Sequence, residues 1–504
     1  MPFQRASGIL LHPTSFPGRF GMGDLGPVAY EFIDFLTETG QQLWQVLPLG
    51  PTGHGNSPYM SYSAMAGNHL LISLEKLRDH GLLEQSDLDE FPHFPDDEVD
   101  FGGVLPTKLK LLEKAAETFN AQADDESRTE YEAFCQEHAF WLDDYAFFMA
   151  LKRAHGGASW HQWEDALARR EAPAMATWHA KLSTAIAYHK YFQFEFTRQW
   201  KALKAYANER HIQIVGDMPI YVAHDSVDVW AFPDNFMIDQ ETLEPSEMAG
   251  VPPDYFSETG QLWGNPTYNW EIIQKQGFRW WLQRVKSLLE YVDLTRIDHF
   301  RGFEAYWAVP EGEKTALNGE WVEAPGEAFF NTVKAEFGSL PILAEDLGVI
   351  TPEVEALRDQ FGFPGMKILQ FAFGGDHTNP YLPFNYHVQN CLVYTGTHDN
   401  DTTVGWFDKA SEYERDRVLR YIGGLHADGI HWSMIRLALS STANQAIIPL
   451  QDLLGLGSFA RMNSPGKADG NWAWRYRSEM LTGELRERLR ELTRLYGRTP
   501  AHWH

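Results

Sequence analysis

The chain has 504 residues, of which 44% are hydrophobic, and it carries a formal net charge of −27 at pH 7. This hydrophobic fraction supports a large folded core and excludes a disordered chain. The negative charge argues against nucleic acids and anionic membranes as partners, because both would repel the protein.

Neither the cysteines nor the start of the chain indicates export or a metal site. Cys135 and Cys391 are too few for a disulfide framework and lack the spacing of metal ligands. The apolar run within residues 1–18 is too short for a signal peptide and is interrupted by Pro and Gly. No stretch of the sequence reaches the roughly 18 apolar residues of a membrane span. We therefore expect a soluble, cytoplasmic protein.

Short apolar segments typical of buried strands recur along the chain, and helical patterns separate most of them. A helix is predicted after the first segment, because Pro27 lies near its start and Gly40 just beyond its end. Another is predicted after the fifth, with Thr351 as cap and Pro352 in its first turn. The predicted strands are residues 7–12, 42–50, 212–222, 292–300, 341–348, 366–373, 390–398 and 445–455.

This alternation of strands and helices predicts an α/β fold with a parallel sheet, and eight strands are the number that closes a (β/α)8 TIM barrel. An open, doubly wound sheet is the alternative, but no Gly-rich phosphate loop follows the first predicted strand. We predict a single catalytic barrel over residues 1–504. Residues 51–211, far longer than an ordinary connection, are predicted to form an inserted, mostly helical subdomain after strand 2. Residues 242–269, rich in Pro, Gly and aromatics, are expected to form an irregular loop over the active-site cleft.

Acidic residues stand at the ends of five predicted strands: Asp217, Asp298, Glu345, Asp399 and Asp452. In a barrel of this kind the carboxyl ends of the strands form one rim, and the chemistry takes place there. Any one of these acids could be a helix cap or a solvated loop residue. Five of them in the same topological position predict an active site.

Two kinds of chemistry use such clustered carboxylates. One is metal-dependent hydrolysis, with His299, His398, Asp399 and Asp401 as ligands, but the sequence has no His-x-His or His-Glu-x-x-His spacing to support it. The other is glycosyl transfer, in which one carboxylate attacks the anomeric carbon while a second carboxyl group protonates the leaving oxygen. The residues favour glycosyl transfer.

Three segments around these acids resemble the catalytic blocks of 4-alpha-glucanotransferases of the amylomaltase (disproportionating enzyme) type, within the alpha-amylase superfamily. They are RIDHFRGFEAYW (296–307), AEDLG (344–348) and TGTHDNDT (395–402). Further blocks occur in family order over nearly the whole chain, among them residues 56–68, 216–222, 252–270 and 449–466. Two positions depart from the family pattern: Phe459 stands where an acid is expected, and His69 where Pro is usual.

The resemblance implies that Asp298 is the nucleophile, Glu345 the general acid/base, and Asp399 the third carboxylate, which holds sugar hydroxyls. The residues themselves agree with this. Arg296 lies two positions before Asp298, so on a strand both side chains point the same way, and a guanidinium favours an ionised neighbour. A structural ion pair inside the barrel is the alternative for Arg296, and the two roles are compatible. Glu345 shares its strand face with Leu343, which suits an acid that must start protonated.

Substrate contacts are predicted from the same blocks and from the aromatic insert. Aromatic faces in residues 242–269 suit glucose rings, although they could instead pack the insert's own core. His398 is expected to donate hydrogen bonds to sugar, His299 is left open between that role and packing, and Asp217 is expected to bind either Arg296 or sugar. The predicted substrate-binding residues are Tyr59, Asp217, Tyr255, Phe256, Trp263, Arg296, His398 and Asn463.

The predicted function is transfer of α-1,4-glucan segments to the 4-hydroxyl of an acceptor glucan or glucose. The mechanism implied is a retaining double displacement through a covalent β-glucosyl intermediate on Asp298, with the carboxyl groups of Asp298 and Glu345 roughly 5–5.5 Å apart. No cofactor and no metal are expected, because the carboxylates supply the chemistry. A hydrolytic amylase and a non-catalytic glycan-binding protein are the alternatives.

Overall fold

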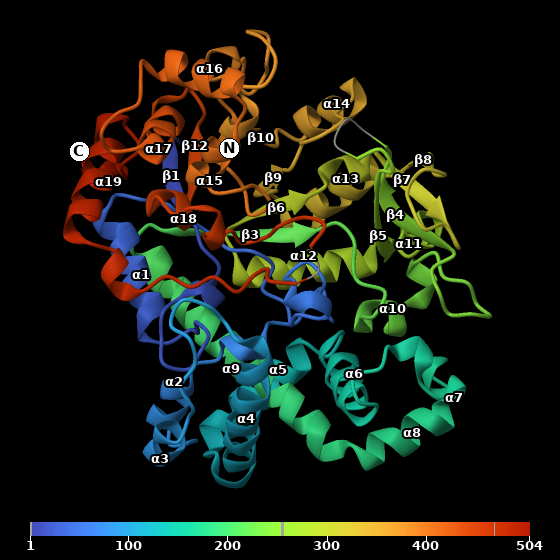
Figure 1. The fold of residues 1–504 in the computed structure, drawn as a ribbon. Coiled ribbons are helices and arrows are strands. Elements are labelled where there is room, and N and C mark those ends of the chain that lie inside the picture. Colours follow the sequence, from blue (N-terminus) through green and yellow to red (C-terminus); the bar gives the residue numbers. More distant parts are fainter. Residues whose placement is uncertain (1–2, 254–256, 468, 504) are drawn as a thin grey trace.

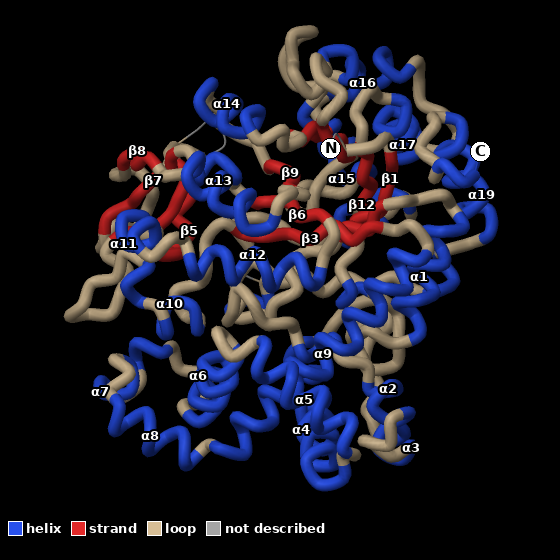
Figure 2. The backbone as a smooth tube through the Cα atoms, turned by 180° about the vertical axis from the view of Figure 1, so that it is seen from behind, coloured by secondary structure: helices blue, strands red, loops and turns tan. Residues whose placement is uncertain are grey.

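The structure, a computed structural model, describes residues 3–253, 257–467 and 469–503. Its centre is an eight-stranded parallel sheet in which successive strands pair at all but one junction and the first strand pairs with the last (Figures 1 and 2). All eight predicted strands are therefore confirmed. They are β1 (Ala6–Leu10), β2 (Leu43–Gln45), β3 (Gln213–Pro219), β6 (Leu294–Asp298), β9 (Ile342–Ala344), β10 (Gly365–Ile368), β11 (Cys391–Tyr394) and β12 (Gln445–Pro449).

The sheet closes between β9 and β10, the two strands at the ends of its hydrogen-bonded order. The backbone N–H of Ala344 donates to the carbonyl of Pro364 at 2.9 Å. Two residues beyond that bond on each strand, Asp346 Oδ1 accepts the backbone N–H of Met366 at 2.6 Å. The closed sheet confirms the predicted (β/α)8 barrel and excludes the open, doubly wound alternative.

Asp346 is the side chain that joins this seam. Besides Met366 it binds Arg358 of α14 (Pro352–Gln360), with 2.5 Å between the guanidinium Nη1 and the carboxylate. A Cβ atom on Gly365 would lie 2.2 Å from the Asp346 carboxylate, so only glycine allows the strand to approach it. Because β9 is short, a side chain supplies hydrogen bonds that a longer strand would make through its backbone.

The alternation of side chains along the strands separates two apolar regions. One fills the barrel interior, with Leu10, Val215, Leu343 and Tyr394 among its members. The other lies between the strands and the surrounding helices. The described helices outside the first long insertion are α1 (Pro27–Glu38), α10 (Val227–Ala231), α11 (Trp270–Lys275), α12 (Arg279–Tyr291), α13 (Gly326–Phe337), α14, α15 (Thr403–Lys409), α16 (Glu412–Ile422), α17 (Ile430–Ser440), α18 (Leu450–Leu453) and α19 (Gly483–Leu495). Within the described residues, none of the helices combines the length and apolarity that crossing a membrane requires.

The predicted helix between the first two strands begins at Pro27 as expected, and Thr351 and Pro352 open α14. Between β2 and β3 the chain forms a group of helices on one side of the barrel (Figure 1). The last of them is long enough to return to the barrel, where Trp200 donates its indole N–H to the carbonyl of Tyr291 at 2.7 Å. These helices are α2 (Leu74–Asp79), α3 (Gln85–Asp89), α4 (Phe101–Gln122), α5 (Asp125–Glu137), α6 (Leu142–Ala154), α7 (Asp165–Ala168), α8 (Ala172–Lys181) and α9 (Ser183–Glu209).

Residues 242–269 differ from the irregular loop that we expected. They contain β4 (Glu247–Val251) and β5 (Gln261–Pro266). These strands form a four-stranded antiparallel sheet with β7 (Ala305–Pro310) and β8 (Glu320–Glu323), in the order β5-β4-β7-β8. The expectation is wrong there because β7, one of the two strands that pair with β4, comes from a distant part of the chain, and the local Gly and Pro residues conceal the strand pattern.

The closure at Asp346 leads to a stability prediction. Asp346→Ala should lower the free energy of unfolding by about 3 kcal/mol, because it leaves the partly buried Arg358 without its carboxylate and the seam without an acceptor. Asp359→Ala is the matched control, since Asp359 binds the same Arg358 from a position that is 66% exposed, and should cost less than about 1 kcal/mol. Urea denaturation of both variants measures the difference; equal losses would contradict the role of Asp346.

Candidate active site

The predicted acids gather at the carboxyl ends of neighbouring strands. Asp217 lies near the end of β3, Asp298 is the last residue of β6, and Glu345 follows β9 directly. Asp399 stands in the loop after β11. Parallel pairing puts these strand ends on the same rim, and side chains from other segments connect them.

Arg296 links two of the acids through one guanidinium group. Its Nη1 donates to both carboxylate oxygens of Asp217, at 2.8 Å each, and its Nη2 donates to Asp298 Oδ1 at 2.8 Å. The register between β3 and β6 sets Asp217 directly beside Arg296. Burial alone would lower the pKa of Arg296, but the two carboxylates raise that pKa well above its ordinary value. The guanidinium therefore stays charged inside the barrel mouth.

Asp217 and Arg296 were both predicted to bind substrate, and the structure shows what they contact. The side chain of Asp217 is fully buried and that of Arg296 is 5% exposed. Their polar atoms contact other side chains of the site, including the Tyr59 hydroxyl, which donates to Asp217 Oδ2 at 2.8 Å. Of the two partners expected for Asp217, the structure supplies Arg296.

Glu345 lies in a different electrostatic environment. Burial is the largest effect and, with the nearby Asp298, raises the pKa of Glu345 to about 7, although Arg296 opposes the rise. Two backbone N–H groups also oppose it: His299 donates to Oε2 at 2.7 Å and Leu347 to Oε1 at 2.9 Å. Near neutral pH a large fraction of Glu345 is thus protonated, as a general acid requires.

His299, which separates Asp298 from the following 3-10 turn, has an unusual backbone. Its φ of 53° and ψ of 50° place a non-glycine residue in the left-handed region, a conformation that costs energy. This conformation directs its N–H at Glu345. Burial lowers the pKa of the His299 imidazole to about 4, so the ring is neutral. Within the described residues its buried Nε2 has no hydrogen-bond partner.

A chain of side chains connects Asp217 to Asp399. The Tyr59 hydroxyl, bound to Asp217, also lies 3.2 Å from His398 Nδ1, and the Tyr59 and His398 rings stack with 4.8 Å between their centres. His398 Nε2 in turn lies 3.3 Å from Asp399 Oδ2. Asn463 Nδ2 donates to the other oxygen of Asp399 at 2.7 Å. Tyr59, His398 and Asn463 thus lie beside the acids, and their predicted contact with sugar stays a prediction.

His398 and Asp399 shift each other's pKa in opposite directions. Burial alone would lower the pKa of His398, but Asp399 raises that pKa above the ordinary value. For Asp399, burial would raise the pKa, whereas the contacts with His398 and Asn463 bring it below the usual range. The side chain of Asp399 is 51% exposed, so its carboxylate is accessible at the rim.

Arg461 is a residue that the sequence analysis missed. Its Nη2 donates to the backbone carbonyl of Asp399 at 2.9 Å, and its Nε donates to the carbonyl of Asn463 at 2.9 Å. It therefore ties the two segments that carry Asp399 and Asn463. Its position two residues before Asn463 was the available signal, but a backbone contact of this kind leaves no pattern in the sequence.

Two other acids near the rim have structural partners. Asp452, the acid after β12, is buried and accepts from the Thr395 hydroxyl at 2.5 Å and from the Thr403 N–H at 2.6 Å. Asp401 pairs with Lys409 at 2.6 Å and accepts from the Ser458 hydroxyl at 2.9 Å. In the described part of the chain, the four residues proposed for a metal site (His299, His398, Asp399 and Asp401) do not come together as one group of ligands.

The aromatic residues predicted on the insert are only partly described. Trp263 of β5 lies beside the site, where its ring stands perpendicular to that of His299 with 4.8 Å between the centres. Tyr255 and Phe256 lie outside the described residues. The predicted contact of these two side chains with sugar therefore stays a prediction.

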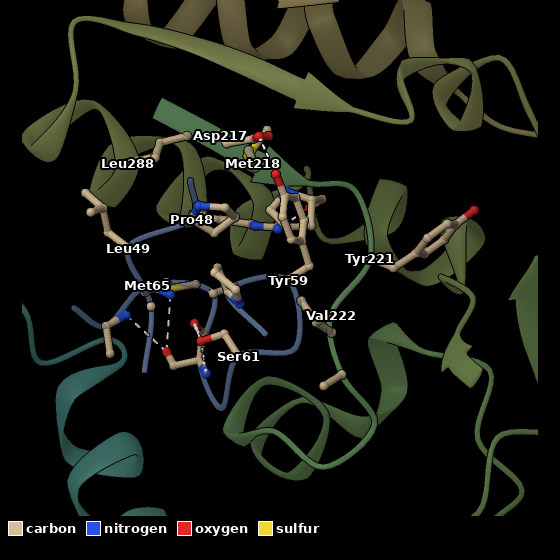
Figure 3. A pocket seen from close by; sticks show the side chains of 18 of the residues that line it. Pro48, Leu49, Tyr59, Ser61, Met65, Asp217, Met218, Tyr221, Val222 and Leu288 are labelled. Atoms are coloured by element: carbon tan, nitrogen blue, oxygen red, sulfur yellow. Dashed lines mark hydrogen bonds between the residues drawn. The ribbon is translucent and has the colours of Figure 1, made fainter. Parts of the chain in front are cut away.

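A cavity of about 60 Å³ lies beside Tyr59 and Asp217 (Figure 3). Ser61, Met65 and Tyr221 contribute to its wall, which is largely apolar. Such a volume holds a few water molecules. Figure 3 shows the Tyr59 hydroxyl directed at Asp217, and both residues line this cavity.

Comparison with known proteins identifies the family to which this arrangement belongs. Residues 11–482 match the sequence profile of the 4-alpha-glucanotransferase family. The chain belongs to the 4-alpha-glucanotransferase family. It is 57% identical over 500 residues to the 4-alpha-glucanotransferase of Synechocystis, with 99% of each chain covered. It is 50% identical over 491 residues to that of Thermus thermophilus, with 96% of each covered. The resemblance noted in the sequence is confirmed, and the protein is an enzyme with 4-alpha-glucanotransferase activity.

Solved structures agree with this assignment. The amylomaltase from Streptococcus agalactiae in complex with acarbose superimposes with a TM-score of 0.94 at 41% identity, over 99% of this chain and 100% of that one. The amylomaltase from Corynebacterium glutamicum shares the fold, with a TM-score of 0.81 at 17% identity over 97% of this chain and 75% of that one.

The raised pKa of Glu345 predicts how its replacement changes stability with pH. A carboxyl whose pKa rises from 4.5 to about 7 on folding holds its proton more tightly in the folded state, so stability is lost as pH rises through this window. Glu345→Gln removes the ionisation and should be more stable than the parent at pH 8 by about 2–3 kcal/mol, with the gain fading toward pH 4. Chemical denaturation at several pH values measures this. Glu355→Gln, on an exposed face of α14, is the control expected to show no such trend; a constant difference across pH would refute the prediction.

Proposed function

We propose that the enzyme transfers α-1,4-glucan segments by a retaining double displacement, with Asp298 as nucleophile and Glu345 as general acid/base. One observation carries the proposal: the two carboxyl groups lie in opposed environments on adjacent strand ends. Asp298 accepts a hydrogen bond from a charged guanidinium, whereas burial raises the pKa of Glu345 to about 7. Such a pair suits a nucleophile and an acid that work together.

In the first half-reaction, Glu345 gives its proton to the glycosidic oxygen of the donor while Asp298 attacks the anomeric carbon. The bond between that carbon and the glycosidic oxygen breaks, and a β-glucosyl ester to Asp298 forms. The reducing-end fragment leaves as an alcohol. Asp399, charged and half exposed, stabilises the developing positive charge and holds hydroxyl groups of the attacked sugar.

In the second half-reaction, the 4-hydroxyl of an acceptor replaces the departed fragment. Glu345, now a carboxylate, takes the hydroxyl proton as the acceptor oxygen attacks the anomeric carbon. The ester bond to Asp298 breaks, and a new α-1,4 bond forms with both catalytic groups restored. The backbone N–H groups of His299 and Leu347, which donate to Glu345, stabilise its charged form at this stage.

The substrate class follows from the same site. Donors are maltooligosaccharides and larger α-1,4-glucans, and acceptors are shorter glucans or glucose. Tyr59, His398, Asn463 and Trp263 are proposed to contact sugar, as are Tyr255 and Phe256. The solved Streptococcus agalactiae relative was determined with acarbose, which supports a sugar-binding cleft in this architecture. Asp217 and Arg296 are proposed to position Asp298 and Tyr59, because both are buried.

The mechanism predicts a specific product pattern. Incubation with maltotriose alone should produce oligosaccharides both longer and shorter than the donor, and Asp298→Asn should lower the rate by at least about 10³-fold, because the covalent step has no nucleophile. Chromatography of the products measures both. Asp408→Asn, an exposed acid on α15, is the control and should retain the parent rate. Only glucose and maltose as products would mean that water is the acceptor, and the proposal of transfer would fail.

The covalent intermediate can be tested separately. Glu345→Gln lacks the acid and the base, so a maltotriosyl donor whose leaving group departs without a proton, such as an α-fluoride, should glycosylate Asp298 and then stall. Mass spectrometry should show one added maltotriosyl group on the peptide that contains Asp298. The double variant Glu345→Gln with Asp298→Asn should show none. A label on any other residue would identify a different nucleophile.

A further inference from the structure

A second group of potential ligands lies outside the active site. It consists of His161, His224 and Glu244, whose ligand atoms all lie within 4.8 Å of one another. His161 Nε2 is 3.2 Å from one oxygen of Glu244, and His224 Nδ1 is 3.8 Å from the other. The three residues come from three segments: the connection between α6 and α7, the loop after β3, and the turn before β4.

The proton on His224 is placed by its surroundings. His224 Nε2 lies 2.9 Å from the backbone carbonyl of Leu243, an acceptor, so this nitrogen carries the hydrogen. In the neutral ring Nδ1 then presents a lone pair toward Glu244. Histidine ligands of metals are held in this way, with one nitrogen donating to a carbonyl and the other free to coordinate.

This arrangement leaves two acceptors facing each other. With Nε2–H bound to the Leu243 carbonyl, the lone pair of His224 Nδ1 and the Glu244 carboxylate have no hydrogen between them. Within the described chain no Lys or Arg forms an ion pair with Glu244. A cation between the two groups resolves the mismatch.

His161 is also available as a ligand. Among the described residues its only polar partner is Glu244, and its buried Nδ1 has no partner. The His161 and His224 rings stack with 5.0 Å between their centres, at 29° to each other. Both imidazoles therefore border the same carboxylate.

One other group with ligand-type side chains occurs in the described residues: Glu137, His138 and Glu290. There the ammonium group of Lys201 lies 3.2 Å from Glu290, so a cation is already present. In that group Lys201 balances the charge of Glu290 without a metal. The group therefore serves as a comparison for His161, His224 and Glu244.

We propose that His161, His224 and Glu244 bind a divalent transition-metal cation, with Zn²⁺ as the representative ion. Two imidazoles and a carboxylate are a donor set that Zn²⁺ accepts, and water would complete the tetrahedron on the exposed side of Glu244. None of the three residues belongs to the active site described above, so the ion has no part in the transfer chemistry.

The ion would stabilise a junction between the helical segment and two segments that border the catalytic rim. Existing contacts mark this junction: Trp160 Nε1 donates to the carbonyl of His224 at 2.7 Å, and Arg169 Nη1 donates to the carbonyl of Gln240 at 2.6 Å. In Figure 1, α10, which follows His224, lies next to α6 and α7. A metal would add a third, coordinate link at this place.

The test uses the full chain, stripped with a chelator, dialysed and supplied with ZnCl₂. We expect one bound zinc per chain by elemental analysis and a rise in melting temperature of at least about 2 °C. His161→Gln and His224→Gln should weaken zinc binding at least about tenfold in calorimetric titration. His138→Gln, from the comparison group, should bind zinc as the parent does.

Melting temperatures without zinc show whether each variant folds, and the visible spectrum of bound Co²⁺ provides a second readout of the ligands. The proposal is overturned if the stripped chain binds no zinc at equimolar concentration, or if His138→Gln abolishes binding while His161→Gln and His224→Gln retain it. The transfer reaction with maltotriose, measured on the same samples, tests the proposed function separately from zinc binding.

Discussion

The active site depends on one buried positive charge. Arg296 spans the gap between Asp217 on β3 and Asp298 at the end of β6, and the energetic cost of burying a guanidinium is offset by these two carboxylates. The planar fork of arginine donates to both acids at once, which a lysine could not do. Because Asp217 also accepts from Tyr59, the same charge orders the chain of contacts that reaches His398 and Asp399.

Next to Arg296, backbone N–H groups influence the protonation of Glu345. Glu345 lies one residue beyond β9, where the left-handed conformation of His299 directs an N–H at its carboxylate. Those donors support the charged form that the second half-reaction requires, while burial keeps the resting pKa about 7. A single carboxyl group can then act as acid and as base without a change of fold.

The closure of the barrel and the catalytic acid are adjacent in the chain. Asp346 follows Glu345 and points the other way, into the seam between β9 and β10, where it binds Met366 and Arg358. Alternation along an extended segment thus lets one residue close the barrel and its neighbour serve the site.

The sequence by itself determined the eight strands, the helix starting at Pro27 and the acids at the strand ends, because these depend on local periodicity and on the common rim of a parallel barrel. Only the tertiary structure decided what those acids contact: Asp452 is buried and accepts from Thr395 and Thr403, whereas the side chain of Asp399 is about half exposed. The antiparallel sheet of β4 and β7, the backbone contacts of Arg461, and the meeting of His161 with His224 were likewise undecided. Each depends on contacts between segments far apart in the chain, and such pairings are selected by packing of the whole molecule rather than by local residue preferences.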